Sequence, residues 1–215
     1  MFPDLHTHRT DALPGEAVVC IPPDVLPEEF SPQEGVSYSA GWHPQSLPSH
    51  LQEGRAALLR LLQQPSVTAI GECGIDRTVS SSPLEKQREA FLLQIELSER
   101  LQKPLILHIV HAFDLLLGLH KTVRPHMPWI VHGFRGKPAT AIQLLEAGMH
   151  LSFGAHFNEE SVVACPTERL FVETDANTEI SRKALYDKLA ALKGLPPEEL
   201  ANSVMQRMKA LKLIR

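Results

Sequence analysis

Six side chains with metal-binding chemistry stand at or just after short apolar stretches that are typical of buried β-strands. The stretches read FPDLHTH, VTAIGEC, PLILHIV, WIVHGF and LFVETD, and the side chains are those of His6, His8, Glu72, His108, His132 and Asp175. In a barrel of parallel strands, the carboxyl ends of all strands open on one face, where residues distant in sequence meet. Four imidazoles and two carboxylates meeting there would suit a two-metal centre. The pattern therefore predicts a metal-dependent enzyme.

The first two of these histidines, His6 and His8, are separated by one residue. Alternate residues of a strand point to the same side, so both imidazoles can reach one cation. Taken alone, the pair also fits two buried barrel histidines with ordinary hydrogen-bond partners. Glu72 follows an apolar strand between Gly71 and Gly74. Its two oxygens can bind separate ions, although a loop acid beside a turn would show the same local pattern.

The next two histidines, His108 and His132, each end an apolar stretch. One such histidine is usually a buried neutral residue, but two at matching positions on successive strands favour metal ligands. Asp175 follows the last predicted strand and can bind a metal and accept a proton from bound water; the alternative is a helix N-cap. We assign Asp175 and Glu72 the catalytic roles and place Glu173 outside the ligand set.

Two further residues are predicted to meet the substrate at the same rim. His43, in AGWHPQ, ends the third strand, and a structural turn histidine beside Pro44 is its alternative interpretation. Arg135, in HGFRG, is the cation nearest to the predicted cavity and can meet an anionic substrate. A solvated loop arginine explains it equally well.

Composition limits the class of protein. The 215 residues carry a net charge of −4 and a pI near 6.3, which gives no basic surface for nonspecific binding of duplex nucleic acid. The three cysteines, Cys20, Cys73 and Cys165, are scattered and suggest neither a disulfide framework nor a CxxC metal site. The first residues lack the features of a signal peptide, and no stretch has the character of a membrane span. We therefore expect a cytoplasmic protein with no membrane partner.

Strand-like and helix-like stretches alternate along the chain, which is the pattern of an α/β fold. Continuous Val, Ile, Leu and Ala runs predict strands that are buried on both faces. We predict eight strands, at Asp4–His8, Ala17–Ile21, Val36–Gly41, Val67–Gly71, Pro104–His108, Trp129–His132, His150–Phe153 and Leu170–Glu173. Helices are expected between Pro48 and Pro65, from Pro83 to Pro104, at Phe113–Thr122 and Pro138–Ala147, and twice after Ser181. Residues 1–215 are expected to form a single domain.

The front of this predicted barrel is reduced. Only residues 9–16 separate the first two strands, which is too short for a helical crossover. The next connection, residues 22–35, is rich in proline and has no helical period. We therefore expect a distorted (β/α)8 TIM barrel whose first crossover helices are missing. The side without helices would leave a barrel face exposed, and a second copy of the chain could cover it as a homo-oligomer.

The chain resembles the TatD-like metal-dependent hydrolases, a family within the amidohydrolase-type barrels. The resemblance spans nearly the whole chain and implies a hydrolase that uses divalent metals on phosphoester bonds, commonly at DNA ends. It also implies that His6, His8 and Asp175 bind one ion, that His108 and His132 bind the other, and that Glu72 is shared. The matching stretches, in family order, are PDLHTH, AGWHPQ, AIGECGID, LEKQREAFLLQIELSERLQKPLILH, VHGFRG, HLSFGA and ERLFVETDA.

Three features depart from the family pattern. The family usually has an arginine two residues after the histidine of the fifth strand, where this chain has Val110. After ETDA, the family's long substrate loop is replaced by NTEIS and a helix. The first crossover helix is also missing. Every position implied to bind metal is kept while the substrate-holding parts are reduced, so hydrolysis is better supported than DNA as the substrate.

The predicted mechanism is attack on a phosphorus or carbonyl centre by a water activated by two metals, with Asp175 as base. The nitrogen-rich ligand set favours zinc or manganese over magnesium, and all three stay open. We expect a phosphodiesterase or deoxyribonuclease of exonuclease type, with single-stranded DNA ends as the expected substrate. One alternative is a metal-dependent hydrolase of a small ester, lactone or amide. Another is a metal-binding subunit of an assembly without catalytic activity.

Overall fold

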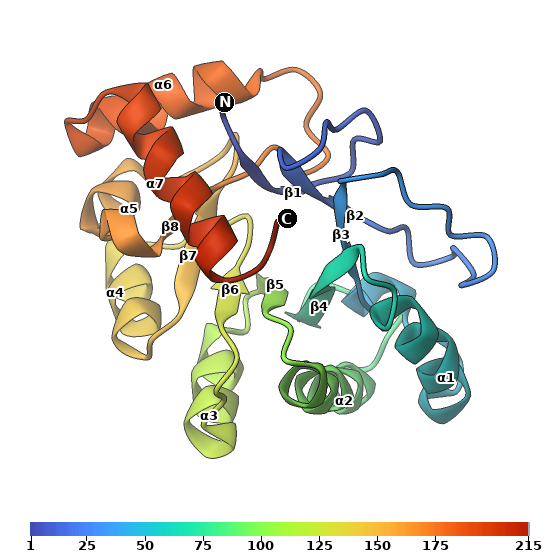
Figure 1. Ribbon diagram of the computed structural model, residues 1–215. Helices are drawn as coiled ribbons and strands as arrows, with labels where there is room; N and C mark the ends of the chain where they lie inside the picture. Colours follow the sequence, from blue (N-terminus) through green and yellow to red (C-terminus); the bar gives the residue numbers. More distant parts are fainter. Residues whose placement is uncertain (215) are drawn as a thin grey trace.

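The computed structural model describes residues 1–214, and eight parallel strands form its centre (Figure 1). Each strand pairs with the next one along the chain, from β1 to β8. Almost every strand residue is buried, as expected for a parallel sheet that is covered on both faces. The strands are β1 (Asp4–Thr7), β2 (Ala17–Cys20), β3 (Ser37–Ala40), β4 (Val67–Asp76), β5 (Leu105–Val110), β6 (Trp129–Val131), β7 (His150–Phe153) and β8 (Leu170–Val172).

The ring closes between β8 and β1 through a short bridge rather than a full ladder. Thr7 and Asp175 form an isolated parallel bridge. The Asp175 N–H donates to the His6 carbonyl at 2.9 Å, and the His8 N–H donates to the Asp175 carbonyl at 3.2 Å. The predicted (β/α)8 barrel is therefore confirmed. Its closure involves the backbone of three predicted metal ligands.

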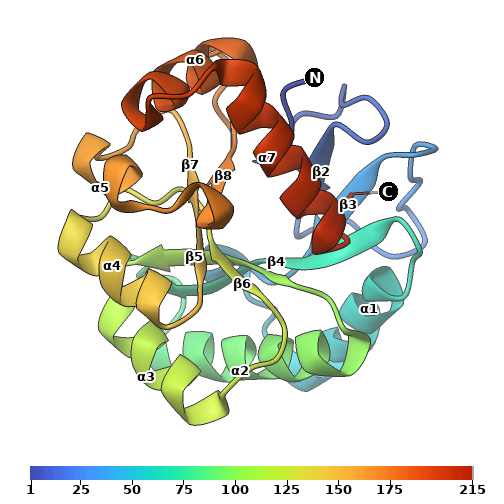
Figure 2. The same cartoon turned by 60° about the vertical axis from the view of Figure 1, so that its left-hand side comes forward.

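Helices cover most of the ring of strands, but no helix in the described part of the chain connects β1, β2 and β3 (Figure 2). Prolines stand at or next to the first residue of α2, α4 and α7, where a missing N–H costs nothing. Gly148 follows α4 with φ of +91°, a conformation that glycine adopts without strain. The predicted helices are confirmed, and the structure adds the six-residue α5. The helices are α1 (Leu51–Leu62), α2 (Leu84–Leu101), α3 (Phe113–Val123), α4 (Pro138–Glu146), α5 (Glu159–Ala164), α6 (Arg182–Lys193) and α7 (Pro197–Ala210).

The front of the barrel has no crossover helix within residues 1–214, as the short connections predicted. Val25 and Phe30 of the irregular connection between β2 and β3 pack against the core instead. The chain after α7 runs back to the start of β4, where the Thr68 hydroxyl donates to the Leu213 carbonyl at 2.7 Å, and its end lies within the outline of the ring of strands in Figure 1. Every residue of β1, β2 and β3 is buried within the chain itself. The prediction that this face is exposed for a second copy to cover is therefore wrong for these strands.

The main correction to the predicted strands concerns β4. It was expected to end at Gly71, but it continues to Asp76, so Glu72 lies inside the strand rather than after it. Gly74 allows this extension because β4 passes very close to β5, and a Cβ at Gly74 would lie 2.2 Å from the His108 carbonyl oxygen. His108 likewise lies within β5 instead of ending it. The extension places both side chains within the carboxyl-terminal part of the barrel.

None of the helices within residues 1–214 combines the length and apolar character that crossing a membrane requires.

Candidate metal centre

Glu72 stands at the centre of the predicted ligands, and its two oxygens face different histidines. Oε2 lies 3.4 Å from Nε2 of His6 and 3.2 Å from Nε2 of His8. Oε1 lies 2.9 Å from Nε2 of His132 and 3.8 Å from Nδ1 of His108. One carboxylate therefore stands between two pairs of imidazoles. This is the arrangement that a carboxylate shared by two cations requires.

Asp175 joins the His6 and His8 side of this cluster. Its Oδ1 lies 3.7 Å from Nε2 of His6 and 3.4 Å from Nε2 of His8. Alternate residues of a strand point to the same side, so the imidazoles of His6 and His8 face the same way. The bridge between Asp175 and Thr7 brings the Asp175 carboxylate to them. His6 is fully buried and His8 lies at the cavity mouth. The structure thus brings all six predicted ligands together.

Two further carboxylates orient the histidines on the other side. Nδ1 of His132 lies 3.3 Å from Oε1 of Glu173, and Nε2 of His108 lies 3.0 Å from Oδ2 of Asp76. A carboxylate accepts hydrogen bonds, so each of these ring nitrogens can carry a proton, which would leave the other ring nitrogen of a neutral imidazole free to bind a cation. Metal-binding histidines are commonly oriented in this way. Glu173 was expected outside the ligand set, which agrees with this contact.

Asp76 was not predicted from the sequence, although a signal for it was present. Asp76 is four residues after Glu72, and residues separated by an even number along a strand share a side. Its Oδ1 accepts hydrogen bonds from the N–H of Thr78 at 2.8 Å and from the Thr78 hydroxyl at 2.6 Å. Because the predicted strand ended at Gly71, this register was not considered. Asp76 therefore fixes the ring of His108 and is itself held in place by the following turn.

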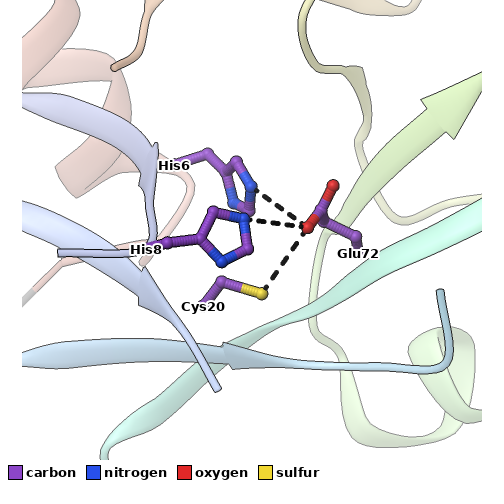
Figure 3. Close-up of side chains that lie close together, drawn as sticks. All are labelled: His6, His8, Cys20 and Glu72. Atoms are coloured by element: carbon purple, nitrogen blue, oxygen red, sulfur yellow. Dashed lines mark hydrogen bonds and ion pairs between the residues drawn. The ribbon is translucent and has the colours of Figure 1, made fainter. Parts of the chain in front are cut away.

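Cys20 is the second residue that the sequence analysis missed. Its thiol lies beside the same Glu72 oxygen that faces His6 and His8, at 3.8 Å (Figure 3). Cys20 ends β2, so a place at the carboxyl end of a barrel strand was the available signal. Burial, followed by the charge of Glu72, raises the pKa of this thiol to about 12. Cys20 is therefore not a free thiolate nucleophile at neutral pH.

The buried nitrogen atoms of the cluster fit a bound cation. Both ring nitrogens of His6 and Nε2 of His132 have no hydrogen-bond partner among the described residues, although all three are shielded from solvent. Buried polar groups are normally paired, and unpaired ones need an explanation. His6, His8, Cys20 and Glu72 each offer one donor atom, and these atoms all lie within 4.8 Å of one another. The residues present therefore fit a divalent metal.

The electrostatics keep the carboxylates of the cluster negative. Burial raises the pKa of Glu72, but its contacts with His132 and His6 outweigh burial and hold that pKa well below its ordinary value. The contact with His8 is the main cause that lowers the pKa of Asp175 to about 2. Hydrogen bonding to Asp175, and then to Glu72, raises the pKa of His8 to about 9. The cluster thus holds excess negative charge that a cation would balance.

The two predicted substrate residues lie beside this cluster. His43 and Arg135 both line the cavity of about 950 Å³ that also exposes Glu72. Nδ1 of His43 accepts the Gln45 N–H at 3.1 Å, so a neutral His43 carries its proton on Nε2, which lies 4.0 Å from Oε1 of Glu72. Burial, followed by the charge of His108, lowers the pKa of His43 to about 4. His43 is therefore a neutral donor facing the cavity, and Arg135 is an exposed cation on its wall.

Comparison with known proteins decides the family. The model for the TatD related DNase family matches residues 28–211. The chain belongs to this family. The match begins after His6, His8 and Cys20, so it is the structure that places these three residues beside Glu72.

Individual relatives agree with this TatD-family assignment. An uncharacterized metal-dependent hydrolase of Bacillus subtilis, YabD, is 29% identical over 191 residues, which cover 80% of this chain and 75% of YabD. The 3'-5' ssDNA/RNA exonuclease TatD of Klebsiella pneumoniae is 31% identical, over 70% of this chain and 63% of its own length. This chain therefore spans less than two thirds of that exonuclease. The crystal structure of YJJV, a TatD homolog from Escherichia coli K12, has the same fold, with a TM-score of 0.80 at 23% identity over 98% of this chain and 97% of YJJV.

Proposed function

We propose that this chain is a divalent-metal-dependent phosphodiesterase that removes nucleotides from the ends of single-stranded nucleic acid. The observation that carries the proposal is the position of Glu72, whose two oxygens face two separate groups of histidines. Membership of the TatD-related family supports this assignment. The substrate class follows relatives that are named 3'-5' ssDNA/RNA exonucleases.

Each side of the cluster has its own set of donors in this proposal. His6, His8 and Asp175 would hold one ion, and His108 and His132 would hold the other. Glu72 would contribute one oxygen to each ion, in keeping with the distances around it. When bound, two such ions lower the pKa of water and stabilise both the attacking and the leaving oxygen of a phosphodiester. Zinc and manganese suit the imidazole-rich set better than magnesium does.

The remaining steps belong to side chains of the protein. Asp175 stays a carboxylate at neutral pH because of its contact with His8, so it can orient the attacking water and accept its proton. The Nε2–H of His43 faces the cavity and can donate to a phosphate oxygen of the substrate. Arg135 and Lys137 line the same cavity and offset the negative charge of the nucleic acid.

The cavity favours a chain end over a continuous duplex. Its volume of about 950 Å³ is at the upper end of the range for pockets that enclose small ligands. A net charge of −4 provides no general attraction for a long polyanion. Insertion of one strand end into a pocket that holds cations fits both observations better than sliding along duplex DNA does.

The three buried cysteines, none of them in a disulfide, also fit a reducing compartment such as the cytoplasm.

The proposal is tested with the purified full chain, stripped of metal by a chelator and reloaded with zinc, manganese or magnesium. Single-stranded DNA and RNA labelled at either end report hydrolysis and its direction, and neutral esters are tested in parallel. Wild type should shorten the nucleic acid only with metal, whereas Glu72→Ala should lose the second ion and turnover. Undiminished turnover by Glu72→Ala would disprove the shared role of Glu72. A wild-type protein that binds two ions and hydrolyses none of these substrates would support the alternative of a metal-binding subunit.

A further inference from the structure

One donor beside the proposed metal centre has no part in the proposed function. The Sγ atom of Cys20 lies 3.8 Å from Oε2 of Glu72, on the side where His6 and His8 approach that oxygen (Figure 3). Cys20 is only 7% exposed, yet it lines the cavity. Thiolate sulfur is a common zinc ligand in proteins. The place of this thiol, beside two imidazoles and a carboxylate, is that of a ligand.

The separations of three donors from Glu72 match those between zinc ligands, and Asp175 would be a fifth donor to the same ion. Ordinary zinc bond lengths and tetrahedral angles place nitrogen and oxygen ligands about 3.4 Å apart, and sulfur and oxygen ligands about 3.6 Å apart. The observed separations from Oε2 of Glu72 are 3.4 Å to His6, 3.2 Å to His8 and 3.8 Å to Cys20. Each differs from the ideal value by about 0.2 Å or less. A cation with ordinary zinc bond lengths therefore fits the three separations that involve Glu72.

We propose that Cys20 is a thiolate ligand of the ion held by His6 and His8, and that it makes this position selective for zinc. The inference rests on the proposed metal centre and adds a residue to it. Binding replaces the thiol proton, which leaves to solvent, by a sulfur–metal bond. Sulfur is a soft ligand that suits zinc well and manganese or magnesium poorly. Cys20 thus sets the identity of one metal.

The alternative is a buried thiol that does no more than donate a hydrogen bond, either to Oε2 of Glu72 at 3.8 Å or to the Ile21 carbonyl at 3.7 Å. Such a thiol explains the contact of Cys20, but Nε2 of His6, which is fully buried 3.4 Å from the same oxygen, still has no hydrogen bond among the described residues. A cation among the donors accounts for both atoms. The other cysteines do not share this position, since Sγ of Cys73 contacts the Ile106 carbonyl and Sγ of Cys165 contacts the Pro166 carbonyl.

The experiment uses the full chain, freed of metal and loaded with cobalt or zinc. Thiolate–cobalt bonding gives a charge-transfer band in the near ultraviolet, and X-ray absorption of the zinc form shows a sulfur neighbour at about 2.3 Å. Wild type and the control Cys165→Ser should show both signals, and Cys20→Ser should lose both. Competition with a chelator should show that Cys20→Ser weakens zinc binding at least about tenfold, with a smaller loss for manganese.

The outcomes separate this inference from the proposed function. Wild type that binds cobalt and degrades nucleic acid, but shows neither sulfur signal, would overturn the role of Cys20 and leave the nuclease intact. Signals that persist in Cys20→Ser would overturn it as well. Sulfur signals that depend on Cys20 in a protein without hydrolytic activity would support the ligand and count against the nuclease. The wild-type spectrum is decisive by itself, even if Cys20→Ser does not fold.

Discussion

At the scale of single residues, the proposed ligands depend on partners that the ions would not touch. Asp76 accepts a hydrogen bond from Nε2 of His108, and Glu173 accepts one from Nδ1 of His132. The two histidines consequently present different ring nitrogens to Glu72. The sequence predicted the six ligands because each stands near the end of an apolar stretch. It did not show which nitrogen each histidine presents, since that depends on contacts between strands.

Replacing Asp76 by asparagine should weaken the second ion without removing a ligand. The amide can also donate a hydrogen bond, so it no longer fixes the proton on Nε2 of His108. We expect affinity for the second ion to fall about 10- to 100-fold, with the first ion retained. Isothermal titration calorimetry of the metal-free variant measures the affinities for the first and the second ion. The control is Asp114→Asn, which alters an exposed partner of Arg77, and equal second-ion affinities in the two variants would refute the role of Asp76.

Replacing His43 tests whether it contacts substrate or metal. As a neutral donor on the cavity wall, it should contribute to substrate turnover and not to metal content. His43→Phe should lower kcat/KM on single-stranded DNA by about 10- to 100-fold, the size expected when one charge-assisted hydrogen bond is lost. His43→Gln, which keeps an N–H donor, should recover part of this loss. Metal analysis of both variants is the check, because a missing ion in His43→Phe would make His43 a ligand.

At the scale of elements, the metal centre depends on how the barrel closes. The last strand meets the first through the backbone of Asp175 and through Thr174, whose N–H and hydroxyl donate to Asp4 at 3.0 and 2.6 Å. The sequence predicted the strands and their order but not this bridge, which is too short to leave a pattern. It also placed the end of β4 too early, because glycines that usually end a strand here permit close pairing with β5.

The variant Thr174→Val should loosen this closure while keeping the shape of the side chain. It leaves one oxygen of the buried Asp4 carboxylate without its hydroxyl donor. The free energy of unfolding should fall by about 1–3 kcal/mol, and metal affinity should fall with it because Asp175 is the next residue. Urea unfolding with and without zinc measures both effects. Thr122→Val, at an exposed position of α3, should change the stability by less than about 0.5 kcal/mol, and an equal loss in both variants would argue against the closure.

At the scale of the whole molecule, the absence of crossover helices between β1, β2 and β3 could be predicted from the sequence. How these strands are buried without such helices could not. Connection length alone excludes a helix between β1 and β2. The packing of the C-terminal residues against the start of β4 depends on contacts between residues more than a hundred positions apart, such as Thr68 and Leu213. Local sequence pattern carries no information about such contacts. For the same reason, the burial of β1, β2 and β3 without crossover helices could not be predicted from the sequence.

The protonation of His150 affects the free energy of unfolding of the whole protein. This residue lies at the amino end of β7, away from the metal-ligand cluster at the carboxyl ends of the strands. Burial, followed by the charges of Arg169 and Arg207, lowers its pKa from 6.5 to about 3. The fold therefore holds the neutral ring, whereas the unfolded chain takes up a proton below about pH 6.5. The stabilisation from this residue is complete above pH 6.5 and is lost as the pH falls toward 3.

His150→Leu should flatten the acid limb of the stability curve. Between pH 6 and pH 4, the free energy of unfolding should fall by about 1.4 kcal/mol less per pH unit in the variant than in wild type, which corresponds to one proton. Urea unfolding at several pH values, with chelator present throughout, excludes any contribution from metal release. Other histidines contribute equally to both proteins, so the difference in slope isolates His150. Parallel curves would show that the ring is protonated in the folded protein, against the direction that burial and the two arginines impose.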